Sequence, residues 1–161
     1  MLIINSRDED IKETVTKYRD SILRFAYAYL RNRPDAEDIS QEVFITYIEK
    51  PPIYKTEEKK KAWLMQVTSN KCKNVLSSVW KKRVSTLPDD LAYMPRENAD
   101  ITQFVLTLDT KYRIPIHLFY YEGYSIEEIA QLMNAPTATV GTWLARGRKK
   151  LRDRIGDDYF G

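Results

Sequence analysis

A pair of short helices separated by a break constrains this chain more than any other feature. Residues 124–155 read YSIEEIAQLMNAPTATVGTWLARGRKKLRDRI. Ser125, with Glu128 three residues later, has the pattern of a capping box, which predicts that a helix begins there. Because proline cannot supply a helical N–H, Pro136 predicts that this helix has ended, and Thr137 can cap a second one.

Both helices are predicted to be amphipathic. The first has an apolar stripe at helical spacing, made of Ile126, Ile129, Ala130, Leu132 and Met133. Each residue advances about 100° around a helix, so the inner side of the second holds Val140, Leu144, Gly147, Leu151 and Ile155. The opposite side holds Ala138, Thr142, Ala145, Arg146 and Lys149, with Arg148 and Arg152 nearer the rim. This pattern predicts a helix-turn-helix whose second helix enters a DNA major groove. A helical hairpin with a solvated basic face is the plainer alternative.

Charge is distributed unevenly along the 161 residues, although the net charge is only +3. Residues 51–84 carry 9 basic and 2 acidic side chains, and residues 111–161 carry 8 and 6. By contrast, residues 1–50 carry 8 basic and 10 acidic side chains, and residues 85–110 carry 1 and 5. Two basic segments separated by an acidic one predict two contacts with nucleic acid.

Residues that could support catalysis or bind metal are few. The only cysteine, Cys72, and the only histidine, His117, have no second ligand or nucleophile beside them in the pattern, which favours structural roles. We find no nucleophile–base pair, metal-ligand spacing or Gly-rich phosphate loop, so we expect no enzymatic activity, metal, cofactor or small-molecule substrate. No apolar run approaches the roughly 20 residues that span a bilayer, and we expect a cytoplasmic protein.

Two amphipathic helices are predicted near the N-terminus, the first over residues 8–31. Asp35 can cap the second, which Pro51 ends. Its inner side is predicted to hold Ala36, Ile39, Val43, Tyr47 and Ile48, with Phe44 on the flank. Its other side holds Asp38, Gln41, Glu42 and an exposed Ile45. This second side could dock a protein, but chemistry alone favours an ordinary solvated face. Paired carboxylates for acid–base or metal chemistry would need partners that the pattern lacks.

The next predicted helix covers residues 61–83. Its inner stripe holds Leu64, Val67, Thr68, Cys72, Val75 and Val79. Its outer side holds Trp63, Gln66, Asn70, Lys73, Asn74 and Ser77. Amides can bond base edges, tryptophan can stack on a base and lysine neutralises phosphate, which suits single-stranded or distorted DNA. A solvated helix whose Trp63 packs on a neighbour explains the same pattern equally well.

Residues 85–100 contain two prolines and four acidic side chains, and they predict a linker. The fold expected is therefore all-α, with one small domain over residues 1–84 and a second over residues 101–161 that contains the helix-turn-helix. A short helix is predicted at residues 101–108. A further helix, capped by Asp109 or Thr110, is expected to reach about Tyr121, to be kinked at Pro115 and to end at a left-handed Gly123.

Three stretches together resemble the extracytoplasmic-function (ECF) sigma factors of bacterial RNA polymerase. They are ILRFAYAYLRNRPDAEDISQEVFITYIEK at 22–50, KAWLMQVTSNKCKNVL at 61–76, and LDTKYRIPIHLFYYEGYSIEEIAQLMNAPTATVGTWLARGRKKLRDRI at 108–155. They occur in family order and cover most of the chain. The blocks DAEDISQEVF and YSIEEIA…TVGTWLARGRKKL are specific in combination, whereas the second alone would fit many helix-turn-helix regulators.

This resemblance implies a subunit that binds core polymerase and directs promoter-specific initiation. By analogy, Asp38, Gln41, Glu42 and Ile45 contact the clamp helices of the β′ subunit. Promoter −10 DNA would be bound by Lys61, Trp63, Gln66, Asn70, Lys73 and Asn74. Promoter −35 DNA would be bound by Thr139, Gly141, Thr142, Ala145, Arg146, Arg148 and Lys149. The β flap of polymerase and an anti-sigma factor are further partners that the family implies.

Departures from the family pattern leave the promoter sequence open. Gly141 and Trp143 stand where basic residues are frequent in the family, and Lys60 stands where an aromatic is common. Two other functions also remain. A stand-alone helix-turn-helix regulator would need a dimer interface and a palindromic operator. An adaptor built from two helical domains would show no salt-dependent binding to promoter DNA.

Overall fold

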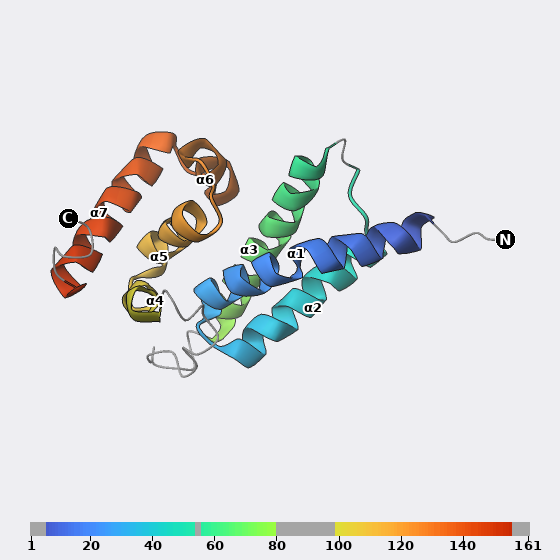
Figure 1. The fold of residues 1–161 in the computed structure, drawn as a ribbon, viewed down its shortest axis with the longest axis horizontal. Coiled ribbons are helices and arrows are strands. Elements are labelled where there is room, and N and C mark those ends of the chain that lie inside the picture. The colour runs from blue at the N-terminus through green and yellow to red at the C-terminus, as the bar shows by residue number, and fades with distance from the viewer. Residues whose placement is uncertain (1–5, 54–55, 80–98, 156–161) are drawn as a thin grey trace.

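The computed structural model describes residues 6–53, 56–79 and 99–155, and every regular element in these ranges is helical (Figure 1). The elements are α1 (Ser6–Leu30), α2 (Arg33–Glu49), α3 (Glu57–Val79), α4 (Ala99–Leu106), α5 (Thr110–Ile116), the π-helical turn η3 (His117–Tyr121), α6 (Ile126–Met133) and α7 (Thr137–Ile155). We call α1–α3 the N-terminal bundle and the elements from α4 to α7 the C-terminal bundle. The predicted all-α fold is confirmed. Most of the predicted linker, residues 85–100, lies outside the described residues. Its last two residues, Ala99 and Asp100, belong to α4.

Aromatic side chains of α1 fill much of the N-terminal bundle. Phe25, Tyr27 and Tyr29 are at most 2% exposed. The rings of Phe25 and Tyr29 meet edge to face, with their centroids 5.2 Å apart. The hydroxyl groups of Tyr29 and Ser69 lie 2.7 Å apart, which satisfies both in the interior and joins α1 to α3. Residues 25–29 of α1 are all buried, so this end of the helix packs on every side rather than along one amphipathic face.

The start and the end of α2 both differ from the prediction. Asn32, not Asp35, is the N-cap, and its side chain accepts a hydrogen bond of 2.9 Å from the Asp35 backbone N–H. The helix starts earlier because Pro34 fits the first turn, where its missing N–H costs nothing. At the other end, Ile48 is 42% exposed rather than inward. It lies about 100° around the helix from the buried Tyr47.

The third helix begins at Glu57, inside residues 55–61, which the sequence leaves open as a loop or a helix start, and it is described as far as Val79. Residues 80–83, which the prediction included, lie outside the described residues. Leu64, Thr68 and Cys72 are buried as expected, whereas the valines at 67 and 75 are only half-buried. The buried stripe also holds three residues that the prediction missed, namely Lys60, Met65 and Ser69.

A π-helical turn begins two residues after Pro115, the position where a kink was predicted. The α-helical pattern of α5 ends at Ile116, and the backbone N–H of Glu122 then bonds the carbonyl of His117, five residues back, at 3.2 Å. Gly123 follows with φ +72°, the left-handed conformation that was predicted. The extra residue in this turn changes which side chains meet, because residues five apart in an α-helix lie about 140° from each other.

The helix-turn-helix is confirmed, with one change at its second helix. Val140, Leu144, Gly147 and Leu151 are buried, as the spacing predicted. Thr137 is the first residue of α7 rather than its cap, and the carbonyl of Pro136 accepts the N–H of Val140 at 3.1 Å. Within the described ranges, we find no helix that is both long enough and apolar enough to cross a membrane.

Candidate nucleic-acid interface

The helix-turn-helix is held by local hydrogen bonds that its sequence specifies. Ser125 Oγ accepts the backbone N–H of Glu128 at 3.1 Å, and Glu128 Oε1 accepts the backbone N–H of Ser125 at 2.8 Å. This reciprocal pair is the predicted capping box. At the other end of α6, Asn134 has φ +53° and turns the chain towards α7. The turn leaves α7 at the outer edge of the C-terminal bundle, as Figure 1 shows.

The face of α7 predicted to bind −35 DNA is mostly open to solvent. Thr142, Ala145, Arg146 and Lys149 are exposed, and Thr139 and Gly141 are half-buried. Local contacts are weak. The Thr142 hydroxyl donates to a carbonyl one turn back at 3.1 Å, and Lys149 Nζ lies 3.3 Å from an exposed carboxylate of Asp153. Exposed pairs of this kind contribute little to stability, so these side chains can exchange their partners for DNA groups.

Arg148 differs from the other predicted −35 residues. Its Nη1 donates to the hydroxyl of Tyr120 at 3.3 Å, and it lines a small pocket between α4, η3 and α7. Arg148 is half-buried, and this contact turns its guanidinium towards η3. The structure therefore groups Arg146 and Lys149 on the outer face and leaves Arg148 at the side of the helix.

The predicted −10 residues of α3 share one side of the helix except for Lys61, which lies about 180° around it from Asn70, and they are exposed unevenly. Asn70, Lys73 and Asn74, in the second half of the helix, are exposed, whereas Lys61, Trp63 and Gln66 are half-buried. The Trp63 ring meets the ring of Tyr47 edge to face, with their centroids 5.9 Å apart. Gln66 Nε2 donates to Asn70 Oδ1 at 3.2 Å. An indole fixed by Tyr47 and a row of amides and lysines can offer stacking, base-edge bonds and phosphate contacts.

Beneath this face lies a buried lysine that the sequence analysis did not single out as a site residue. Lys60 is 4% exposed, and its Nζ lies 2.8 Å from Asp10 Oδ1, 2.9 Å from Thr14 Oγ1 and 3.3 Å from Glu57 Oε1. Tyr47 donates a short hydrogen bond to the other oxygen of Asp10. Because Tyr47 also contacts the tryptophan of the −10 face, this cluster, which we call the Lys60 network, supports that face from below.

The Lys60 network also lowers the pKa of its carboxyl groups. Desolvation opposes ionisation of Asp10, but hydrogen bonds and charge from Lys60 and Tyr47 outweigh it, so the pKa of Asp10 lies below its usual value. For Glu57, a hydrogen bond of 2.5 Å from the Tyr18 hydroxyl is the main reason that the pKa is lowered. Both carboxyls are therefore held ionised beside the lysine.

The predicted polymerase-docking face of α2 is exposed along its length. Asp38, Gln41, Glu42 and Ile45 are all exposed, and Ile45 is 50% accessible. Glu42 Oε1 has a long contact of 3.8 Å with Lys71 Nζ of α3. An exposed isoleucine surrounded by acids and an amide is available to a partner, and the geometry leaves these groups on the opposite side of α2 from its buried stripe.

Two buried polar residues stand where the bundles meet. Arg113 is 2% exposed, and burial lowers its pKa to about 9. His117 is 1% exposed, and its Nε2 lies 3.1 Å from Glu122 Oε2. A structural role for His117 agrees with these contacts. The role of Arg113 had no signal in the sequence, because it bonds the carbonyls of Ala28 and Tyr29 in the other bundle as well as Leu108 and Thr110 in its own.

Comparison with known proteins places both bundles in one family. Residues 14–82 match the family model of Sigma-70 region 2, and residues 99–151 match that of Sigma-70, region 4. The chain is 28% identical to the ECF RNA polymerase sigma factor SigW of Bacillus subtilis, over 96% of this chain and 94% of SigW. It is 29% identical to the ECF RNA polymerase sigma factor SigE of Mycolicibacterium smegmatis, over 89% of this chain and 60% of SigE.

A solved structure shows the same fold. The sigma factor RpoE from Bartonella quintana, in complex with the anti-sigma factor NepR, is similar over 93% of this chain and 99% of that chain, with a TM-score of 0.76 and 20% identity. The two matched sigma regions cover more than half of this chain, and they coincide with the N-terminal and C-terminal bundles. On this evidence, the chain belongs to the sigma-70 family, within its extracytoplasmic-function group of sigma factors.

Proposed function

We propose that this chain binds core RNA polymerase and directs promoter-specific initiation. In this proposal the N-terminal bundle binds the −10 element, the C-terminal bundle binds the −35 element, and residues 85–100 link them. One observation carries the proposal: a single chain of the sigma family presents a basic face on α7 and an amide- and lysine-rich face on α3. A stand-alone helix-turn-helix regulator needs only the first of these faces.

The two DNA elements would be read in different physical states. The outer face of α7 fits the major groove of duplex −35 DNA, where Arg146 can bond a guanine edge and Lys149 can contact phosphate. The −10 face of α3 fits bases that have left the duplex, because stacking on Trp63 and bonds to Asn70 or Asn74 need unpaired bases. Such contacts are worth roughly 1–3 kcal/mol per base.

Core polymerase would be bound first. Asp38, Gln41, Glu42 and Ile45 form the docking face that we assign to the clamp helices of the β′ subunit, and the C-terminal bundle would contact the β flap. Core then holds both DNA-binding faces at a fixed spacing, so two weak contacts act together. The chain contributes recognition and no catalytic step of its own, and it acts in the cytoplasm with the polymerase.

An anti-sigma factor is the further partner that we propose. The similar RpoE chain was solved in complex with the anti-sigma factor NepR. Such a partner could control this chain by covering the same faces that polymerase and DNA require.

Run-off transcription tests the proposal directly. Purified protein and sigma-free core polymerase are incubated with a pool of genomic fragments, with core alone as the control. New discrete transcripts that need both components would support the proposal, and aligned start sites would give the promoter motif. If no transcript appears and the chain does not co-elute with core, the proposal fails. Specific operator binding by the free protein would then favour a stand-alone regulator.

A further inference from the structure

Lys60 brings into the N-terminal bundle a charge that an apolar side chain could replace. A lysine is almost never fully buried unless it is paired, and here Asp10, Thr14 and Glu57 place oxygens within 3.3 Å of its Nζ. Replacing a buried ion pair by well-packed apolar residues is often neutral or even stabilising. Stability alone therefore does not account for a lysine at this position, and its contacts indicate a second role.

Tyr47 links this lysine to the −10 face. Its hydroxyl donates to one oxygen of Asp10, whose other oxygen lies 2.8 Å from Lys60 Nζ. The same Nζ lies over the Tyr47 ring, 5.8 Å from its centroid, where a cation is attracted to the ring. The Tyr47 ring in turn meets that of Trp63 at 5.9 Å between centroids and an angle of 61°. Tyr47 is 1% exposed, so the Lys60 network fixes a buried ring against which the indole packs.

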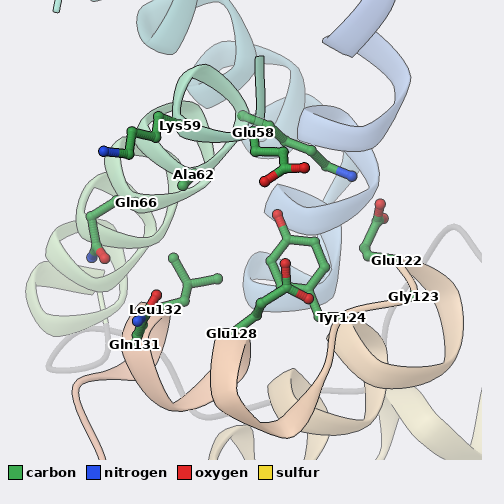
Figure 2. A pocket seen from close by; sticks show the side chains of 11 residues that line it. Glu58, Lys59, Ala62, Gln66, Glu122, Gly123, Tyr124, Glu128, Gln131 and Leu132 are labelled. Atoms are coloured by element: carbon green, nitrogen blue, oxygen red, sulfur yellow. The ribbon is translucent and has the colours of Figure 1, made fainter. Parts of the chain in front are cut away.

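Trp63 is the −10 residue that this support reaches. Lys61 and Gln66 line a pocket of about 630 Å³ between α3 and the segment from Glu122 to Leu132 (Figure 2), whereas Trp63 packs on Tyr47 of α2. The Trp63 side chain is only half-buried. Ordering a mobile side chain on binding weakens the affinity, so an indole that is held beforehand binds a stacked base more tightly.

We propose that Lys60 is a positioning residue for −10 recognition, which holds the Trp63 indole in the orientation on which an unpaired promoter base stacks. It acts through Asp10 and Tyr47, and at 4% exposed it makes no contact with DNA itself. This inference rests on the proposed function, because it takes Trp63 as the residue on which a −10 base stacks. It adds that a charge inside the bundle contributes to DNA binding at the surface.

Two variants break the network, and a third is their control. Lys60→Met removes the charge, and the side chains of Asp10 and Glu57 are 38% and 53% exposed, so water can solvate the carboxylates left behind. Asp10→Ala breaks the same network from α1 and serves if Lys60→Met does not fold. Lys59→Met is the control, at an exposed position whose side chain extends away from α1 in Figure 2. Far-ultraviolet circular dichroism and urea unfolding at pH 7 check that each variant is folded.

The first measurement follows the indole in the free, full-length chain. Trp80→Phe with Trp143→Phe leaves Trp63 as the only tryptophan, so the decay of its fluorescence anisotropy reports the motion of that ring. We expect the unaltered network and the control to show only the tumbling of the whole protein, and both network variants to add a fast component from side-chain motion. A fast component that is already present with the network intact, or absent from both network variants, would overturn the positioning role.

Promoter DNA tests whether the held orientation serves base stacking. The chain in complex with core polymerase is titrated, at one salt concentration, with forked DNA of the promoter motif obtained by run-off transcription. Its non-template strand is unpaired across −10 and is either intact or carries one abasic site. The stacked base is the one whose removal weakens binding by the unaltered chain but not by Trp63→Ala.

A positioning residue and a merely structural one give different results in this titration. We expect Lys60→Met to weaken binding of the intact DNA by about two- to tenfold, the cost of ordering one side chain. It should not change binding of the DNA that lacks the stacked base, and it should add nothing in Trp63→Ala. Its effect should simply add to that of Asn74→Ala, near the other end of α3. Lys59→Met should bind both DNAs like the unaltered chain.

An equal loss on intact and abasic DNA, or a loss that persists in Trp63→Ala, would show that Lys60 acts on the bundle as a whole and would refute the inference. If the unaltered chain with core binds no promoter DNA, the proposed function fails and the −10 role of Lys60 fails with it. The anisotropy decay would then still show whether Lys60 orders the indole, so the two failures can be told apart.

Discussion

The two bundles place their exposed faces in different ways. The N-terminal bundle packs helices of 25, 17 and 23 residues, so its candidate binding residues are spread along the faces of α2 and α3. The C-terminal bundle uses helices of 8, 7 and 8 residues to support a single longer one, α7, of 19 residues. Long helices can serve two partners on two faces, whereas the short ones serve to position one helix. Substitutions on α2 and on α3 should therefore affect binding to different partners. In the C-terminal bundle, the substitutions that affect binding should lie mainly on α7.

The largest effect is expected at the docking face of α2. Asp38→Arg with Glu42→Arg should weaken core binding by at least about 30-fold, because losing one partner of a charge pair buried in an interface costs about 2–5 kcal/mol. Co-elution and anisotropy with sigma-free core would measure it. Glu9→Arg with Glu13→Arg is the matched control, as it makes the same charge change at the same spacing on an exposed face of α1. If both double variants bind core equally well, the exposed face of α2 is not the docking site.

A smaller and more selective effect is expected on α7. Arg146→Ala should cost about 1–3 kcal/mol at promoters with an intact −35 element, if it bonds a base. Lys150→Ala removes a charge from the same helix, but Lys150 Nζ lies over the ring of Tyr112, 5.5 Å from its centroid, so it serves as the control. Transcription from paired promoters, with and without the −35 element, would measure the difference. The same loss at both promoters would argue against base recognition by Arg146.

Two glycines of α7 sharpen the contrast between its inner and outer sides. A Cβ at Gly147 would lie 3.0 Å from Ile116 Cγ1, whereas a Cβ at Gly141 would have nothing within 4 Å. Alanine favours helix at both sites, but overpacking costs about 1–3 kcal/mol. Gly147→Ala should therefore be less stable than Gly141→Ala by about that amount, in urea unfolding. If the two variants are equally stable, α5 and α7 can move slightly apart without lowering the free energy of unfolding.

The smallest effect is expected on the stability of the N-terminal bundle at acid pH, through the Lys60 network. The pKa values of Asp10 and Glu57 are lowered in the folded state, so their contribution is present above the unfolded pKa of about 4 and is lost as the pH falls through the folded pKa. Both carboxyls are partly exposed, which limits this contribution to about 1 kcal/mol or less. Urea midpoints at pH 7 and pH 3 should therefore differ less in Lys60→Met than in Lys59→Met. An equal change in both variants would show that the Lys60 network is not involved.

Local signals explain why the helix-turn-helix was predictable from the sequence. The capping box at Ser125 and the break at Pro136 act within a few residues, and the inner stripe of α7 follows from helical periodicity alone. Asn32 was missed although a local signal existed, because the preference of proline for the first helical turn favours a cap before Pro34 rather than after it. Such signals need no knowledge of the fold.

The buried charges could not be predicted in the same way. Lys60 bonds Asp10, 50 residues away, and Arg113 bonds the carbonyl of Ala28, 85 residues away. Whether a lysine or arginine is buried depends on such distant partners, because an unpaired buried charge is costly. Periodicity describes one helix at a time. The faces of α2, α3 and α7 were thus open to prediction, and the contact between the bundles was not.

The π-helical turn also bears on which changes of chain length the C-terminal bundle can accommodate. In η3 the N–H of Glu122 bonds the carbonyl of His117 five residues back, one residue more than in an α-helix. If one residue between them were deleted, Glu122 would lie four residues after His117, at the spacing at which two side chains share a face of an α-helix. The turn could then become α-helical and keep the contact between His117 and Glu122, so it is a place where the loss of one residue can be absorbed locally.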